Sequence, residues 1–152
     1  MAYTTSEARQ EVLDAVAEAA NELGLAGACL TEAYEQLDEQ SGDRLEEEIF
    51  RPVQLASGRA KRAHAGFAAR HGLAVGAFED RPVGLPSQGA AGFIERAAEA
   101  AAATDRILAE LQDSMLPVEA GDEQLRADLK AIREPLDGIP GKSRALLSGV
   151  GR

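Results

Sequence analysis

Apolar residues recur every three or four positions along the first forty residues. They are Val12, Val16, Ala19, Leu23, Leu30, Tyr34 and Leu37. At about 100° per residue these positions form one stripe, and acidic residues occupy the opposite side. Thr4 and Glu7 have the spacing of a capping box. The pattern predicts a long amphipathic helix over about residues 5–40, with Gly42 as its C-terminal cap and Asp43 as the N-cap of the next helix.

The second predicted helix covers about residues 43–71. Its apolar positions are Ile49, Val53, Ala56, Ala60, Ala63 and Phe67. Because the connection to the first helix is so short, the two helices are expected to form an antiparallel hairpin. Pro52 falls inside the second helix, where a proline removes a hydrogen bond and costs about 3 kcal/mol. Either the helix kinks there or residues 43–50 form a separate turn, and a kink is our expectation.

Glycine and proline residues then exclude a helix from 72 to 86, so this segment is a long loop. Its apolar residues predict that it folds over the end of the helices. A third helix is expected over about 88–116, capped by Ser87 and ended by Pro117, with Met115 on its apolar stripe. A shorter fourth helix begins near Asp122 and closes at Pro135.

These elements predict an all-α fold: an antiparallel up-down helical bundle of three long helices and one shorter one. The predicted bundle domain covers 1–137, and 138–152 is a flexible or weakly docked tail with at most one turn, near Ser143. The second and third helices could instead be joined by a crossover loop. The short fourth helix leaves half a groove open. Leu146 and Leu147 of the tail could fill it, as could another copy or a partner.

Charge is unevenly distributed along the chain. Residues 1–48 hold thirteen acidic and two basic residues, and residues 79–152 hold thirteen acidic and nine basic ones. The zone between them has no Asp or Glu and carries Arg51, Arg59, Lys61, Arg62 and Arg70. Arg59 and Arg62 are candidate contact residues. These bases could pair with the acidic first helix, which we favour, or bind an external anion.

The residues from Leu23 to Leu30 carry no charge on any side of the first helix. Leu25 and Cys29 point away from the apolar stripe, where a lone bundle would face water. Gly24 and Gly27 would let another helix come close. Burial by a second copy or by the long loop would each explain this ring, and we expect a homo-oligomer, a dimer or larger.

The sequence motifs that could indicate metal binding, nucleotide binding or catalysis are weak. His64 and His71 are two helical turns apart, too far to bind one metal, and neither belongs to a Glu-x-x-His pattern. The Gly-Lys-Ser ending at Ser143 resembles a phosphate loop, but Leu136 replaces the first required glycine and no strand precedes it. Cys29 has no histidine nearby to activate it. No metal or cofactor is therefore expected.

The composition of the chain limits which classes of function and partner remain. A formal charge of −10 with a pI near 4.7 argues against nucleic acid as a partner. No apolar run reaches the roughly 18 residues of a membrane span, and a single cysteine without a leader segment fits the cytoplasm. We expect a non-catalytic interaction or scaffold module that self-associates and binds a protein partner. The alternative is a small-molecule or cofactor-binding four-helix bundle with a ligand near His64, Arg59 or Arg62.

Overall fold

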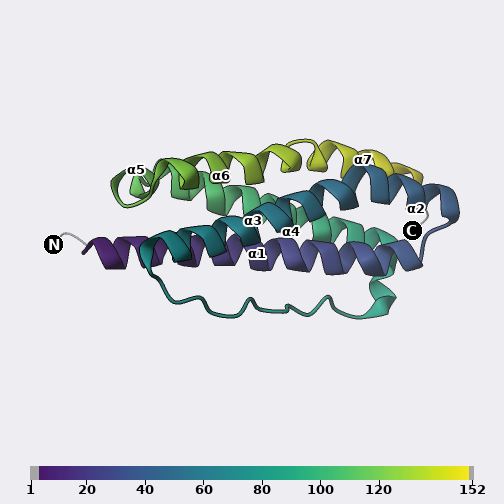
Figure 1. Cartoon of the computed structure of the whole chain (residues 1–152). Helices are drawn as coiled ribbons and strands as arrows, with labels where there is room; N and C mark the ends of the chain where they lie inside the picture. The colour runs from purple at the N-terminus through teal and green to yellow at the C-terminus, as the bar shows by residue number, and fades with distance from the viewer. Residues whose placement is uncertain (1–3, 151–152) are drawn as a thin grey trace.

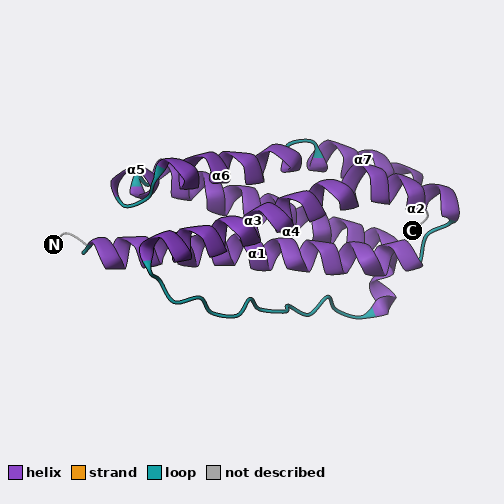
Figure 2. Ribbon diagram, in the orientation of Figure 1, coloured by secondary structure: helices purple, strands orange, loops and turns teal. Residues whose placement is uncertain are grey.

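The computed structural model describes residues 4–150, and within that range the regular structure is entirely helical (Figure 2). The predicted all-α class is therefore confirmed. The elements are α1 (Thr5–Glu35), α2 (Glu39–Leu45), the π-helical turn η1 (Glu46–Phe50), α3 (Arg51–His71), the 3-10 turn η2 (Pro86–Gln88), α4 (Gly89–Asp113), α5 (Leu116–Glu119), α6 (Glu123–Arg133), the 3-10 turn η3 (Glu134–Leu136) and α7 (Ile139–Gly149).

The first helix begins as predicted and ends earlier. The Glu7 backbone N–H donates to Thr4 Oγ1 at 3.1 Å, and the Thr4 N–H donates to Glu7 Oε2 at 3.2 Å, which completes the capping box. The helix ends at Glu35, and the next N-cap is Asp38, whose carboxylate accepts from the Ser41 N–H at 2.7 Å. The predicted caps at Gly42 and Asp43 are wrong, because both residues lie inside α2.

Gly42 is needed for a close approach between helices. It is buried, and a Cβ placed there would come within 3.2 Å of the Tyr34 ring. The ring packs over this glycine from the end of α1, and the Tyr34 side chain itself stays 44% exposed. A glycine between two helical patterns indicates a cap when local sequence is the only guide, and here it serves packing instead.

Helix α2, the turn η1 and α3 follow one another without a break from Glu39 to His71. The Arg51 N–H bonds to the Glu46 carbonyl, five residues back. Pro52 has no N–H to donate, and the wider turn directly ahead of it takes up the change in hydrogen-bond register. The sequence predicts a kink here, or a separate turn over 43–50; the structure contains a π-helical turn over Glu46–Phe50, and the kink stays a prediction. The helix stops at Gly72, whose φ of 63° is in the left-handed region.

The ends of α4 differ from the prediction. Ser87 does not cap it and lies in the turn η2, and Gln88 is the residue at the N-cap position. The helix stops at Asp113 because Met115 adopts a left-handed φ of 70°. Met115 is therefore 51% exposed rather than on the apolar stripe, and Pro117 is buried in the first turn of α5.

The fourth helical segment is longer than predicted. Asp122 is its N-cap, as expected, and accepts from the Leu125 N–H at 2.7 Å. After α6 and η3 the chain continues as the helix α7, where the sequence indicated at most one turn. Ile139 and Leu146 of α7 are buried, and α7 packs against α4, α2 and η1. The space beside α6 is thus filled by this chain, and weak docking of the tail stays a prediction.

The long helices α1, α3 and α4 and the segment from α6 to α7 lie side by side in Figure 1. Helix α1 packs against α4 and α3, α6 packs against α3, and α7 packs against α4. The start of α1 meets the end of the α4–α5 region, where Arg9 Nε donates to the Ala120 carbonyl at 3.1 Å. The end of α1 meets the start of α4, where Gln36 and Gly89 line a common groove.

The loop 72–85 crosses the length of the molecule, from the end of α3 to the start of α4 (Figure 1). It runs along α1 and does not fold over the end of the helices as predicted. Arg81 of this loop bonds to Glu18 and Glu22, and the Glu79 N–H donates to Asn21 Oδ1 at 2.8 Å. The open choice between a hairpin and a crossover is thus decided in favour of the crossover.

The core is rich in alanine and poor in aromatic residues. Most of the predicted stripe positions are buried, and Phe67 and Phe93 are its largest side chains. Small side chains on facing helices let the backbones approach closely. Across the described residues, no helix is both long enough and apolar enough to span a bilayer.

Candidate functional site

The uncharged ring of α1 lies partly inside the protein. Cys29 is 0% exposed, Leu25 and Gly27 are half-buried, and Gly24 is exposed. Leu25 lines a groove together with Arg96 of α4. Burial raises the pKa of the Cys29 thiol, and Arg96 acts in the opposite direction. The expectation that Cys29 would face water in a single chain is therefore wrong.

The two glycines of this ring remain open. A Cβ placed at Gly24 or Gly27 would have no atom within 4 Å outside its own helix. Space for another helix therefore exists beside them, and a contact with a second copy stays a prediction. Of the two tail leucines, Leu146 is buried and Leu147 is half-buried, so only Leu147 presents part of its surface.

The clearest concave surface among the predicted contact residues lies between α3 and α6. We call it the α3–α6 groove, and it is lined by Arg59, Arg62, Ala63, Arg70, Gln124, Asp128 and Ala131. Arg59 and Arg70 are eleven residues apart and lie on one line of the helix, and Arg62 lies on another. These lines are only about 60° apart, so the long side chains converge on one groove.

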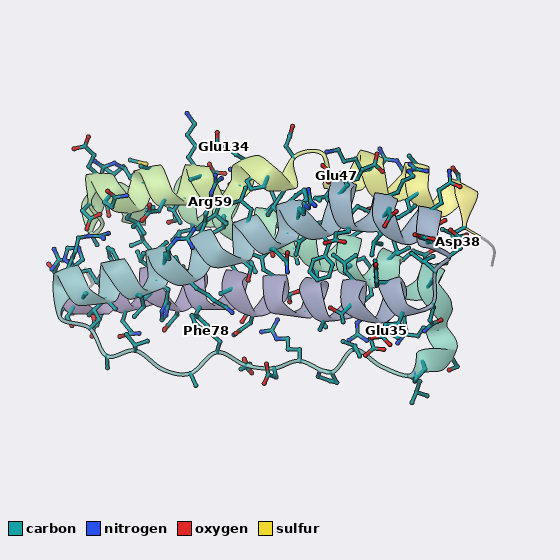
Figure 3. The ribbon with its side chains drawn as sticks, turned by 45° about the vertical axis from the view of Figure 1, so that its right-hand side comes forward. Glu35, Asp38, Glu47, Arg59, Phe78 and Glu134 are labelled. Carbon is teal, nitrogen blue, oxygen red and sulfur yellow. The ribbon has the colours of Figure 1, made fainter. Side chains whose placement is uncertain are left out.

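Two of the three arginines also bind α6 directly. Arg59 Nη1 donates to the Ala131 carbonyl at 2.6 Å, near the end of α6, where carbonyl groups lack partners within the helix. In Figure 3 Arg59 reaches from α3 toward α6. Arg70 donates to both carboxylate oxygens of Asp122 at 2.8 and 3.0 Å. Arg62 is exposed and makes no ion pair or hydrogen bond with any residue from 4 to 150.

The predicted pairing of this basic helix with the acidic first helix is not what the structure contains. Within residues 4–150, the ion pairs of α3 join Arg51 to Glu47 and Arg70 and His71 to Asp122. Glu18 and Glu22 of α1 pair with Arg81 of the loop instead. The sequence could not indicate this, because charge pairing depends on which helix faces which.

Two glycines lie beneath arginines of the α3–α6 groove. A Cβ at Gly58 would be 3.1 Å from Arg62 Nη1, and a Cβ at Gly66 would be 3.0 Å from Arg70 Nη1. In each case the arginine follows the glycine by one turn, and its guanidinium group folds back across the bare backbone. This spacing is the signal in the sequence that could have revealed the groove.

His64 lies on the opposite, loop-facing side of α3. Its ring is buried and stands 5.0 Å from the ring of Phe78, with an interplanar angle of 59°. Phe78 projects from the loop toward the helices in Figure 3, and Lys61 Nζ lies 6.0 Å from its centroid. Burial lowers the pKa of His64, and Asp14 opposes that shift. This histidine thus serves as an apolar anchor for the loop.

The other residues that the sequence offers for metal or phosphate binding are not grouped into one site. In the part of the chain that the structure describes, no three His, Cys, Asp or Glu side chains are grouped so that they could hold a metal ion. His71 lies beside Asp122 rather than His64, at 2.8 Å. Ser143, from the phosphate-loop-like run, is buried in α7, and its Oγ has no hydrogen-bond partner among residues 4–150.

A second groove lies between α4 and the α6–α7 segment. Arg133 spans it, donating to Asp105 Oδ1 at 2.8 Å and to Gln112 Oε1 at 2.6 Å. Arg106 and Lys130 are also part of its lining, without an ion pair to a described residue. Sequence reasoning did not select this groove, because its residues belong to two helices far apart in the chain.

Comparison of the chain with protein-family models, with curated proteins and with solved structures finds no match.

Proposed function

We propose that this protein is a non-catalytic interaction module that binds an acidic segment of a protein partner through the α3–α6 groove. One observation carries the proposal. In a chain with a formal charge of −10, three guanidinium groups, those of Arg59, Arg62 and Arg70, gather in one solvent-accessible groove. Arginine is the residue best suited to bind carboxylates, because its planar group donates two parallel hydrogen bonds.

The scaffold of the module would be a four-helix bundle in which every pair of neighbouring helices is antiparallel. Contacts at both ends of α1 support this arrangement for α1 and α4, and the contacts from Arg59 to Ala131 and from Arg70 to Asp122 support it for α3 and α6. A crossover between α3 and α4 then places these two parallel helices on a diagonal of the bundle, a known variant of such folds.

An acidic protein segment fits the groove better than nucleic acid does. The surroundings of the groove belong to a strongly acidic chain, which repels an extended polyanion beyond the first contact. A short acidic segment can place a carboxylate at Arg62 without bringing a long charged backbone along. Leu55 is 46% exposed one turn before Arg59, and it offers an apolar contact beside the charged groove.

Self-association is the second part of the proposal. The open space at Gly24 and Gly27 supports it, because a helix of another copy could approach the α1 backbone there. The partner-binding groove is on α3 and α6, so both contacts could form at once.

Fluorescence anisotropy with a labelled oligo-glutamate peptide tests partner binding. We expect binding that weakens as salt is added, and a loss of about tenfold in affinity for Arg62→Gln, since a hydrogen-bonded charge contributes roughly 1.5–3 kcal/mol. Arg51→Gln is the matched control, because Arg51 is on the same helix outside the groove. Equal affinities of the wild type and Arg62→Gln would refute the proposal.

Small-molecule binding is a second candidate function. The groove between α4 and α6–α7 favours it, because side chains of both charges line it together with the apolar residues Ala101, Ala102 and Leu136. Native mass spectrometry of the purified protein would reveal a retained ligand as additional mass. A Lys130→Gln variant should then lose that mass, whereas Lys142→Gln, which lies outside the groove, should keep it.

A further inference from the structure

We infer that the segment bound in the α3–α6 groove carries a basic side chain as well as acidic ones, with an acidic group at Arg62 and the basic group at Asp128. The inference deepens the proposed function and rests on it, because it names a feature of the partner segment at the same groove. Asp128 is then the residue that selects a mixed-charge segment over a purely acidic one.

Arg62 and Asp128 belong to opposite walls of the groove, formed by α3 and α6. Residue numbers rise along α3 where they fall along α6, as the hydrogen bonds at the two ends of the groove require. One of these bonds joins Arg59 to Ala131. Arg62 is three residues further along α3 from this contact, and Asp128 is three residues back along α6. The two residues therefore lie at about the same level of the groove.

The two opposite charges are both without an ion pair among residues 4–150. Arg62 folds back toward Gly58, whereas Oδ1 of Asp128 accepts a hydrogen bond at 2.8 Å from Gln124 Nε2, one turn earlier on α6. Because the residue numbers run in opposite directions on the two walls, these contacts draw the guanidinium group and the carboxylate apart. Each is left available for a group of opposite charge on a ligand.

The charges that line the groove favour a ligand that supplies both counter-charges. A purely acidic segment gains the contact with Arg62, but it also brings negative charge near Asp128, which repels it. A segment with a basic side chain toward α6 gains a contact at each wall. It also carries less net negative charge, which suits a chain with a formal charge of −10.

The size of the groove favours an extended segment over a helix. It encloses about 520 Å³, and the small side chains of Ala63 and Ala131 are part of its lining. A helix with its side chains is about 10–12 Å across, so it would rest on the rim. Successive side chains of an extended segment point to opposite sides. We therefore expect the acidic and basic residues of the partner to be one or three positions apart, so that they face opposite walls.

Fluorescence anisotropy of the whole chain with three labelled nine-residue peptides tests the inference. The alternating peptide is Glu-Lys-Glu-Lys-Glu-Ser-Ser-Ser-Ser, and the acidic peptide has glutamate in place of both lysines. The spaced peptide has the composition of the alternating one in the order Glu-Ser-Lys-Ser-Glu-Ser-Lys-Ser-Glu, which puts every charge on one side when extended. We expect the alternating peptide to bind at least about threefold more tightly than either of the others.

The variant Asp128→Asn separates a contact with the basic side chain from general repulsion of negative charge. It should weaken binding of the alternating peptide by about three- to tenfold, because the attraction to lysine is lost, and strengthen binding of the acidic peptide. Glu123→Gln is the matched control, since it removes one negative charge from α6 outside the groove and should leave the ranking unchanged. Arg62→Gln should weaken both peptides. Circular dichroism confirms that each variant is folded.

The outcomes distinguish this inference from the proposed function. Tighter binding of the acidic peptide than of the alternating one would refute the inference and leave the proposed function standing. The same conclusion follows if Asp128→Asn does not change the affinity for the alternating peptide. Equal affinities for the alternating and spaced peptides would refute the placement of the two charges on opposite walls. No binding of any peptide would refute both the inference and the proposed function.

Discussion

Arg70 and Asp122 form a bidentate pair that joins the last turn of α3 to the first turn of α6. Nε and Nη2 of Arg70 lie 2.8 and 3.0 Å from the two carboxylate oxygens of Asp122. The same carboxylate caps α6 at the Leu125 N–H and lies 2.8 Å from His71 Nε2. The hydrogen bonds from Arg70 hold the pKa of Asp122 well below its usual range, and those from Leu125 and His71 act in the same direction, against burial.

This pair makes stability depend on pH. Because the folded-state pKa of Asp122 is lowered, its contribution is present above the unfolded pKa, near about 4, and is lost as pH falls through the folded value. We expect Asp122→Asn, which keeps a capping oxygen, to lower the free energy of unfolding by about 1–3 kcal/mol near neutral pH. The difference should shrink as pH falls below about 4. Urea unfolding over a pH series measures it, and a difference that does not change with pH would contradict the assignment.

Two adjacent leucines test how firmly the tail is docked. Leu146 is buried in the core cluster, whereas Leu147 is half-buried at its edge. If α7 is part of the core, Leu146→Ala should lower the free energy of unfolding by about 2–5 kcal/mol. Leu147→Ala, the matched control, should have a clearly smaller effect. Small effects of both substitutions in thermal unfolding would support the weakly docked tail that the sequence predicts.

Arg81 fixes the crossover loop to α1. Its Nη1 donates to Glu22 Oε1 at 2.6 Å, and its Nη2 donates to Glu18 Oε1 at 2.8 Å. We expect Arg81→Gln to accelerate amide hydrogen exchange across 72–85, most clearly at Glu79, while global stability changes by only about 1 kcal/mol. Hydrogen-exchange mass spectrometry is the measurement. Exchange in the loop that is unaltered by the substitution would show that Phe78 and Asn21 suffice to hold it.

Cys29 should be unreactive in the folded protein. It is fully buried, and burial raises the pKa of its thiol, so little thiolate forms and reagents cannot reach it. We expect the reaction with a disulfide reagent such as DTNB to be slow in native buffer and fast in guanidinium chloride. Rapid labelling in native buffer would mean that the packing around Cys29 opens readily.

Light scattering tests self-association near Gly24 and Gly27. We expect the wild type to be a dimer or larger and Leu25→Glu to be a folded monomer, because a charge at a symmetric contact is desolvated against its own copy. Leu25 also lines the groove beside Arg96, so circular dichroism must confirm that the variant retains its helices. A wild type that stays monomeric at high micromolar concentration would refute the prediction.

The sequence by itself determined the helices and several of their ends. The capping box of Thr4 and Glu7, the N-cap Asp122 and the stop at Gly72 each depend on contacts within a few residues, which local sequence encodes. The 3.6-residue period likewise identified most buried positions, because a helix needs only one apolar face to be stable in a bundle. Where this local signal was ambiguous, as at Gly42, Pro52 and Met115, the predicted boundary was wrong or incomplete.

Only the tertiary structure decided which surfaces meet. Cys29 is buried in the tertiary structure, and Arg96 of α4 is close enough to act on its thiol. Alanine-rich helices offer several faces of similar apolarity, so periodicity could not select the buried face. The crossover path of the loop depends on contacts between residues about 60 positions apart, such as Arg81 with Glu22. The α3–α6 groove likewise exists only because α6 lies beside α3, which turns separate arginines of one helix into a single charged site.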